Sequence, residues 1–97
     1  MTKTFIIRVR LQDATDNQYE QFSINMTNSG YLVTIKDKNG QKYYLPLGNF
    51  KIETTNDKYI ILEHVEKIIL NSWNKKFQIL VTEMTDKGAA WAGLVEC

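Results

Sequence analysis

Three residues near the start of the chain, Arg8, Arg10 and Asp13, have side chains that could act on a phosphate group. Guanidinium groups donate paired hydrogen bonds to phosphate oxygens and could stabilise charge while an RNA strand is cleaved. The Asp13 carboxylate could bind a divalent metal, the one cofactor that these residues suggest, together with its symmetry mate in a dimer. We therefore take all three as candidate catalytic residues.

Each of these residues also has a purely structural interpretation. Asp13 precedes Thr15 and could hydrogen-bond backbone amides where a helix begins. The two arginines could instead pair with Glu83 or with a dimer partner. The sequence leaves both alternatives open.

A second basic group lies on a predicted hairpin. Lys36, Lys38 and Lys42 could contact phosphates, although charged hairpin tips are usually solvated. Tyr43 and Tyr44 are adjacent on a strand and point to opposite faces, so at most one can stack on an unpaired base. We take the three lysines and Tyr44 as candidate RNA-binding residues.

The single histidine and the single cysteine indicate a surface position and a cellular compartment, respectively. His64 is the only histidine, and it lies beside Glu63 and Glu66 on the predicted outer side of a helix, without an evident nucleophile. We interpret it as a solvated residue. Cys97 is the single cysteine, which excludes an intrachain disulfide and fits a reducing cytoplasm.

Two segments repeat apolar residues at helical spacing. A capping box of Thr15 and Gln18 predicts a helix over Asp16–Ser29, which Gly30 ends. A second helix is expected over Asp57–Trp73, with Ile61, Val65 and Ile68 among its core residues.

Strands are expected at Thr4–Leu11, Tyr31–Lys36, Gln41–Thr54 and Phe77–Glu83, with a short last strand at Ala89–Val95. The Asn39-Gly40 pair supplies positive φ for a tight hairpin turn, and Pro46 breaks or bulges the returning strand. This order predicts one α+β domain over residues 1–97. Its architecture would be a ferredoxin-like βαββαβ sandwich with an antiparallel sheet and a short extra C-terminal strand.

One sheet face should remain open, bearing Ile6, Arg8 and Arg10 beside Gln78, Leu80 and Thr82. Monomeric proteins rarely leave such a mixed apolar and cationic surface exposed to solvent, so a partner should cover it. We expect a homodimer with Ile6, Leu80 and Trp91 at its interface. A separate protein partner is the other occupant that this face admits.

Charge and hydropathy exclude other classes of protein. Lys and Arg number 12 against 11 Asp and Glu, a formal net charge of +1, so the strongly basic footprint of a duplex-binding protein is missing. No apolar run reaches the ~18 residues of a membrane span, and the first residues lack a signal-peptide pattern. We expect a cytoplasmic protein without membrane contact.

The chain resembles the GhoS-type antitoxins of type V toxin–antitoxin systems and their uncharacterised bacterial and prophage relatives. The likeness covers about Thr4 to Leu94. It is carried by Leu11-Gln12-Asp13-Ala14, by the helix Tyr19–Gly30, by Asn39-Gly40 leading to Tyr44-Leu45-Pro46, and by Val81-Thr82-Glu83 with Trp91-Ala92-Gly93-Leu94.

The resemblance implies a ferredoxin-like fold close to that of the small CRISPR-associated ribonucleases. It also implies an antitoxin that binds RNA and acts as an endoribonuclease on its toxin's message. In the CRISPR-associated relatives an acidic residue at the end of the first strand helps to bind metal at the dimer interface, and Asp13 lies near that place. The alternative function is a non-catalytic interaction module, such as a prophage-encoded inhibitor of a host or rival nuclease.

Overall fold

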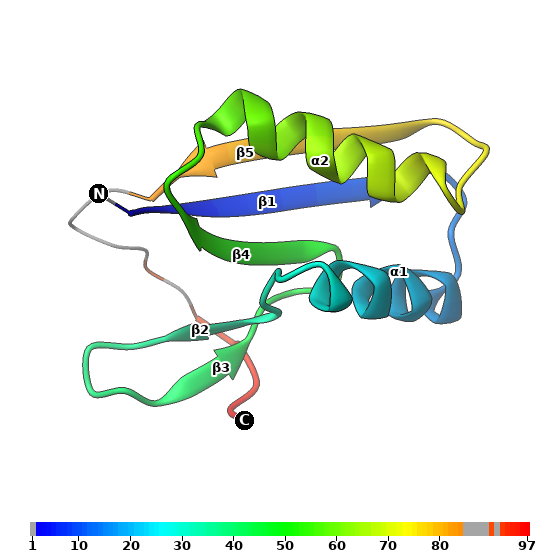
Figure 1. Cartoon of the computed structure of the whole chain (residues 1–97). Helices are drawn as coiled ribbons and strands as arrows, with labels where there is room; N and C mark the ends of the chain where they lie inside the picture. Colours follow the sequence, from blue (N-terminus) through cyan, green and yellow to red (C-terminus); the bar gives the residue numbers. More distant parts are fainter. Residues whose placement is uncertain (1, 85–89, 91) are drawn as a thin grey trace.

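The computed structural model describes residues 2–84, 90 and 92–97. The elements are β1 (Lys3–Leu11), α1 (Asp16–Asn28), β2 (Thr34–Lys36), β3 (Lys42–Tyr44), β4 (Asn49–Thr54), α2 (Lys58–Leu70) and β5 (Phe77–Glu83). An antiparallel sheet has the strand order β4-β1-β5, and β2 and β3 form a separate hairpin (Figure 1). The α+β class is confirmed, but the structure divides the expected single sheet into two.

The core lies between the three-stranded sheet and the two helices. Alternate residues of β1 are buried, namely Phe5, Ile7, Val9 and Leu11. They pack in one cluster with Phe22 and Met26 of α1, Phe50 of β4, and Ile61, Val65, Ile68 and Ile69 of α2. The period-two pattern of the first strand and the predicted inner side of the second helix are therefore confirmed.

Both helices begin at capping residues. Thr15 and Gln18 form the predicted capping box, with reciprocal bonds of 3.2 and 2.8 Å between side chain and backbone. Asp57 caps α2 through bonds from the amides of Tyr59 and Ile60. The caps fix where each helix starts because they satisfy amides that have no partner within the helix.

The helix ends differ slightly from the sequence prediction. At the end of α1, Gly30 adopts φ +97°, and the amides of Gly30 and Tyr31 donate to the carbonyls of Thr27 and Met26. This is the Schellman arrangement that the glycine predicts, with Ser29 as the C-cap rather than the last helical residue. The second helix ends at Leu70 rather than Trp73, and Asn71 is its C-cap.

The hairpin turn is longer than expected. The Asp37 amide donates to the Gln41 carbonyl at 2.9 Å, and the Gly40 amide donates to the Asp37 carbonyl at 3.0 Å. Gly40 has φ +85°, whereas Asn39 does not adopt positive φ. The loop is thus a three-residue turn with a left-handed glycine, because the Asp37 carboxylate holds the amides of Asn39 and Gln41.

The expected strand Gln41–Thr54 is two strands, β3 and β4. Pro46 begins the turn that separates them, and its carbonyl accepts from the Asn49 amide at 3.0 Å. The strand expected from Tyr31 is regular only from Thr34 onward. Before it, Leu32 and Lys51 form an isolated antiparallel bridge, each amide donating to the other carbonyl at 2.8 Å.

The expected last strand, Ala89–Val95, falls partly outside the described residues. In the described part near the C-terminus, the β-pairing is a single bridge between Glu96 and Tyr43. The Tyr44 amide also donates to Val95, and the Cys97 amide donates to Lys42. These described residues therefore extend the hairpin rather than the main sheet. Neither helix is long and apolar enough to span a membrane, within the part of the chain that the structure describes.

Among the described glycines, Gly48 should be the least tolerant of a side chain. It has φ +87°, its carbonyl accepts from the Val9 amide at 2.8 Å, and a Cβ there would lie 2.6 Å from the Val9 carbonyl oxygen. We expect Gly48→Ala to lower the free energy of unfolding by about 2 kcal/mol or more. Denaturant titration measures the change.

Gly40→Ala is the matched control, because Gly40 also has positive φ but has no atom within 4 Å of an added Cβ. Backbone strain alone should lower the free energy of unfolding of Gly40→Ala by about 1 kcal/mol. Equal losses for the two variants would show that the contact with Val9 is not the cause.

Candidate nucleic-acid interface

The open face of the sheet carries the residues that the alternation predicts. Residues directly opposite on antiparallel strands share a face. The register pairs Ile6 with Thr82 and Lys51, Arg8 with Leu80 and Asn49, and Arg10 with Gln78. Both arginines are exposed. The helices cover the opposite face, so this one is left to solvent.

Neither arginine has an acidic partner among the described residues. Glu83 lies opposite Phe5, on the helix-covered side of the sheet, so the alternative in which the arginines pair with Glu83 is wrong. Lys51, which lies opposite Ile6 on this face, forms an ion pair with Glu53 at 3.8 Å. Two unneutralised guanidinium groups therefore remain available to an anionic ligand.

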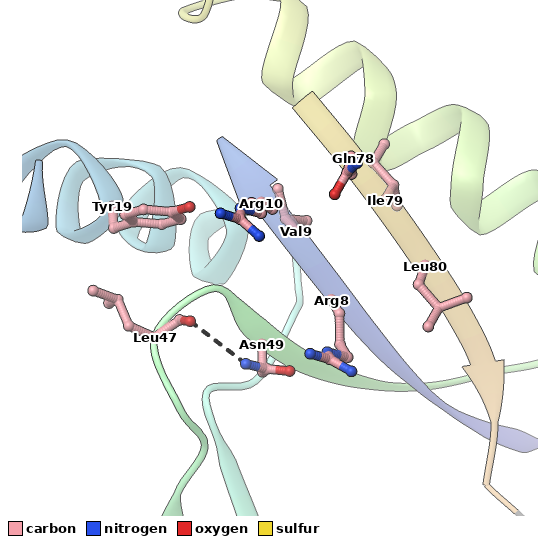
Figure 2. A pocket seen from close by; sticks show the side chains of 9 residues that line it. All are labelled: Arg8, Val9, Arg10, Tyr19, Leu47, Asn49, Gln78, Ile79 and Leu80. Atoms are coloured by element: carbon pink, nitrogen blue, oxygen red, sulfur yellow. Dashed lines mark hydrogen bonds between the residues drawn. The ribbon is translucent and has the colours of Figure 1, made fainter. Parts of the chain in front are cut away.

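The arginines line a hollow of about 450 Å³, which we call the arginine hollow. Its other walls come from α1, from the Pro46–Asn49 turn and from β5. Figure 2 shows Arg10 extending toward Tyr19 and Arg8 extending toward Asn49. The side-chain amide of Asn49 donates hydrogen bonds to the carbonyls of Pro46 and Leu47. These bonds hold this wall of the hollow in place.

Tyr19 closes the end of the arginine hollow. β4 pairs with β1 only as far as Arg8, so the Leu11 backbone lacks a strand partner on that side. The Tyr19 hydroxyl replaces it, accepting from the Leu11 amide at 2.8 Å and donating to the Leu11 carbonyl at 3.3 Å. One phenol thereby fixes α1 against the end of the central strand.

Asp13 lies in a neighbouring hollow of about 720 Å³, the Asp13 hollow, which Arg10, Lys76 and Gln78 also line. Asp13 has φ +59°, the one described non-glycine residue with positive φ. Its side chain forms no hydrogen bond with a described residue, and Thr15 is the helix cap. The alternative in which Asp13 hydrogen-bonds the amides at the start of the helix is therefore wrong.

The Asp13 hollow does not fit a divalent metal. Its described lining has one carboxylate beside two cationic side chains, which would repel a metal ion. In the described part of the chain, no group of three or more His, Cys, Asp or Glu residues could hold a metal. We therefore derive no metal-dependent step.

A third hollow of about 450 Å³, the Tyr44 hollow, lies between α1 and the Pro46–Asn49 turn. Tyr44 and Ile24 line it, and both are about half exposed. Leu47 and Asn49 line both this hollow and the arginine hollow, while Arg10 and Gln78 line both the arginine and Asp13 hollows. The arginine hollow therefore shares wall residues with each of the other two hollows, and we call the three together the furrow.

The hairpin lysines do not join this furrow. Lys36 lies directly opposite Lys42 in the β2–β3 register, and Lys38 lies in the loop. Like charges placed opposite each other destabilise a hairpin slightly. Of the two tyrosines, Tyr44 is the more exposed, as the alternation requires, while the Tyr43 hydroxyl donates to Asp37 at 3.4 Å. Partial burial and the carboxylates of Asp37 and Glu96 raise the pKa of Tyr43.

The residues expected at a dimer interface are placed only in part. Leu80 is 54% exposed at the centre of β5, and Ile6 is half-buried between Lys51 and Thr82. Trp91 lies outside the described residues.

His64 is exposed, as expected, but its Nδ1 lies 3.0 Å from the hydroxyl of Tyr31, a contact that the sequence did not predict. Burial raises the pKa of Tyr31 to about 12, so this phenol remains protonated at neutral pH. The contact joins α2 to the segment after α1.

The sequence analysis missed Tyr19, Leu47 and Asn49 as furrow residues. The spacing of Tyr19 indicated only a helix side facing the core. The Pro46 and Gly48 pair signals a turn, yet nothing local shows that this turn lies beside Arg8.

Comparisons with protein-family models, with curated proteins and with solved structures found no match to this chain.

Tyr19→Phe should remove the link between α1 and β1 while keeping the ring. We expect a loss of about 1 kcal/mol in the free energy of unfolding, because the Leu11 amide loses its partner. Thermal melts followed by circular dichroism measure it. Tyr59→Phe, on an exposed tyrosine whose hydroxyl has no bond to a described residue, should stay within about 0.5 kcal/mol of wild type. If Tyr19→Phe left the free energy of unfolding unchanged, the Tyr19 hydroxyl would not stabilise the contact between α1 and β1.

Proposed function

We propose that the protein binds single-stranded RNA in the furrow, as a cytoplasmic antitoxin that acts on a toxin's message would. The observation that carries the proposal is the pair of exposed guanidinium groups, Arg8 and Arg10, which form no ion pair with a described residue and line a furrow that also holds an exposed tyrosine.

The furrow offers the two contacts that hold single strands. Basic side chains bind the phosphate backbone, and an aromatic ring stacks on an unpaired base. Tyr44 and the arginines are separated by Leu47 and Asn49, which border both of their hollows. A strand crossing the Pro46–Asn49 turn would meet the ring on one side and the cations on the other. The small net charge fits such a local site better than duplex binding.

The arrangement of strands is compatible with the ferredoxin-like fold of the proposed antitoxin family. In that fold the strand after the first helix lies beside the strand before the second helix. The Leu32–Lys51 bridge is one such contact between the β2 segment and β4. This bridge supports a fourth strand position at that edge, where a single residue just before β2, Leu32, pairs with β4.

RNA binding should depend on the furrow arginines. Arg8→Ala and Arg10→Ala should each weaken binding of an unstructured RNA. Each should also lower the slope of log affinity against log salt by about 0.7, because each removes one phosphate contact. Fluorescence anisotropy over a salt series measures both quantities. Lys58→Ala, which removes an exposed cation of α2, is the control and should leave affinity and slope unchanged.

Tyr44→Ala tests stacking separately from charge. Loss of one stacked base should cost about 1–3 kcal/mol in RNA affinity without changing the salt slope. Tyr59→Ala removes a tyrosine that is 69% exposed on α2, compared with 50% for Tyr44, and should have no effect. If wild type binds no RNA, or if the furrow variants and their controls bind equally, the proposal fails.

Cleavage of the bound RNA is a second candidate activity, favoured by the location of Asp13 beside Arg10. Asp13 is the only carboxylate in the described lining of the two hollows that Arg10 borders. A carboxylate can accept a proton from an attacking hydroxyl, and a guanidinium can stabilise charge on the phosphate.

Asp13→Asn should abolish cleavage and keep the fold, because asparagine tolerates positive φ as well as aspartate does. Incubation of the wild type and the variant with a mixed RNA pool, with and without a chelator, measures cleavage. Uncut RNA with wild type, or equal cutting by the variant, would exclude this role. Chelator-sensitive cutting would contradict our conclusion that the site does not bind metal.

A protein partner is the alternative occupant of this surface. Ile24, Leu47 and Tyr44 are each about half exposed around the Tyr44 hollow, which would suit an apolar contact. If this protein is instead a nuclease inhibitor, the bound nuclease would cover the furrow. The protein by itself would then bind RNA poorly. A pull-down with wild type and Leu47→Asp identifies this case if the RNA measurements fail.

A further inference from the structure

β5 is an edge strand of the main sheet. It bonds to β1 on one side, and within the described residues no strand pairs with its other side (Figure 1). The Gln12 amide donates to Lys76, and the Met84 amide donates to Thr4. Hydrogen-bonded pairs alternate along an antiparallel register. These two bonds therefore show that the backbone N–H and C=O groups of the even-numbered β5 residues point toward β1. The backbone groups of Phe77, Ile79, Val81 and Glu83 therefore point outward.

This edge lacks the features that usually prevent association. Exposed edge strands are commonly protected by a proline, a lysine or a bulge, and Phe77–Glu83 contains none of them. Leu80 lies at its centre, 54% exposed on the open face of the sheet. An unbroken row of backbone donors and acceptors, with an exposed leucine in the middle, is a template for another strand.

The helix above the same edge adds one exposed apolar residue. His64 contacts Tyr31, so that flank of α2 faces the segment after α1. At 100° per residue, Leu62 lies on the opposite flank, on the β5 side, and is exposed, with the exposed Glu66 one turn further along the same flank. One exposed leucine thus borders the edge on each face of the sheet.

We propose that a second copy of this chain pairs with β5 through its own β5, antiparallel and centred on Leu80. The twofold axis then places Leu80 against the partner's Leu80, Gln78 against the partner's Thr82, and Ile79 against the partner's Val81. Every outward backbone group of the strand gains a partner in this register. The interface is isologous, which closes the assembly at two copies.

Charge favours this self-pairing over a parallel arrangement. Lys75 and Lys76 precede the strand and Glu83 ends it, and none of them forms an ion pair with a described residue. Antiparallel pairing places the lysine end of each copy beside the glutamate end of the other, at both ends of the interface. No like charges meet within the paired strands.

The dimer would have one six-stranded sheet with one open face. The Arg8 residues of the two copies would be separated by two strands, about 14 Å at the usual strand spacing. The Asp13 residues would lie at opposite ends of the interface, so they could not share a metal. RNA binding within one furrow does not require the dimer, and the two proposals can fail separately.

Disulfide trapping tests the register. In a Cys97→Ser background, Leu80→Cys should form a covalent dimer on mild oxidation, because the axis places the two sulfurs in a non-hydrogen-bonded pair of suitable spacing. Thr82→Cys alone should not crosslink, since it faces position 78 of the partner. A mixture of Gln78→Cys and Thr82→Cys proteins should form the heterodimer. Crosslinking of Thr82→Cys to itself in preference to Leu80→Cys would overturn the register.

Light scattering tests the dimer itself. Wild type should be dimeric at high micromolar concentration, and Leu80→Asp should raise the dimer dissociation constant by at least about 100-fold, because two carboxylates would meet on the axis. Its melting should stay cooperative, since Leu80 is exposed in each copy. Leu32→Asp, at a leucine that is 47% exposed on the other side of the same face, should remain dimeric. A monomeric wild type, or a dimer that Leu80→Asp leaves intact, would overturn the proposal.

Discussion

The position of β1 between β4 and β5 is the constraint on which the rest of the structure depends. One row of its side chains, including Ile7 and Val9, is buried against both helices, and the other row presents Arg8 and Arg10 to solvent. A slip of one residue in either pairing would exchange these rows. Two charged groups would then enter a core without buried polar side chains among the described residues, at a cost of several kcal/mol.

Local signals were sufficient to predict both helices and the strands β1 and β5, but not the exact strands between the helices or the way in which the strands assemble. Alternation along β1 and the capping box at Thr15 act over a few residues, and both are present as expected. The hairpin turn lies where the Asn39-Gly40 pair predicts it, with Gly40 at positive φ, but its loop has three residues because the Asp37 carboxylate binds two loop amides. The sheet order depends on contacts distant in sequence, such as that between Gly48 and Val9.

The same distinction applies to the candidate site. Residues close in sequence, such as Lys36, Lys38 and Lys42, suggested one binding group, but the hairpin holds them away from the described lining of the arginine hollow. Tyr44 joins the arginines only because the Pro46–Asn49 turn borders both of their hollows. Tyr19 reaches the end of β1 from a helix, and helical spacing alone assigned it to the core. Sequence identified chemical groups here, whereas tertiary structure decided which of them meet.

The pairing of β1 with β5 also has a consequence for how the chain is made. Phe5 lies opposite Glu83, so the central strand is synthesised long before one of its two neighbours. At ~5–20 residues per second, the ribosome needs roughly 4–16 s to reach the second of these positions. During that interval the apolar row of β1 has no complete core to enter. Arg8 and Arg10 alternate with these apolar residues along the nascent chain, where charges of one sign oppose aggregation of a hydrophobic strand. By this argument the same two charges that mark the open face of the folded sheet oppose association of nascent strands before the sheet has formed.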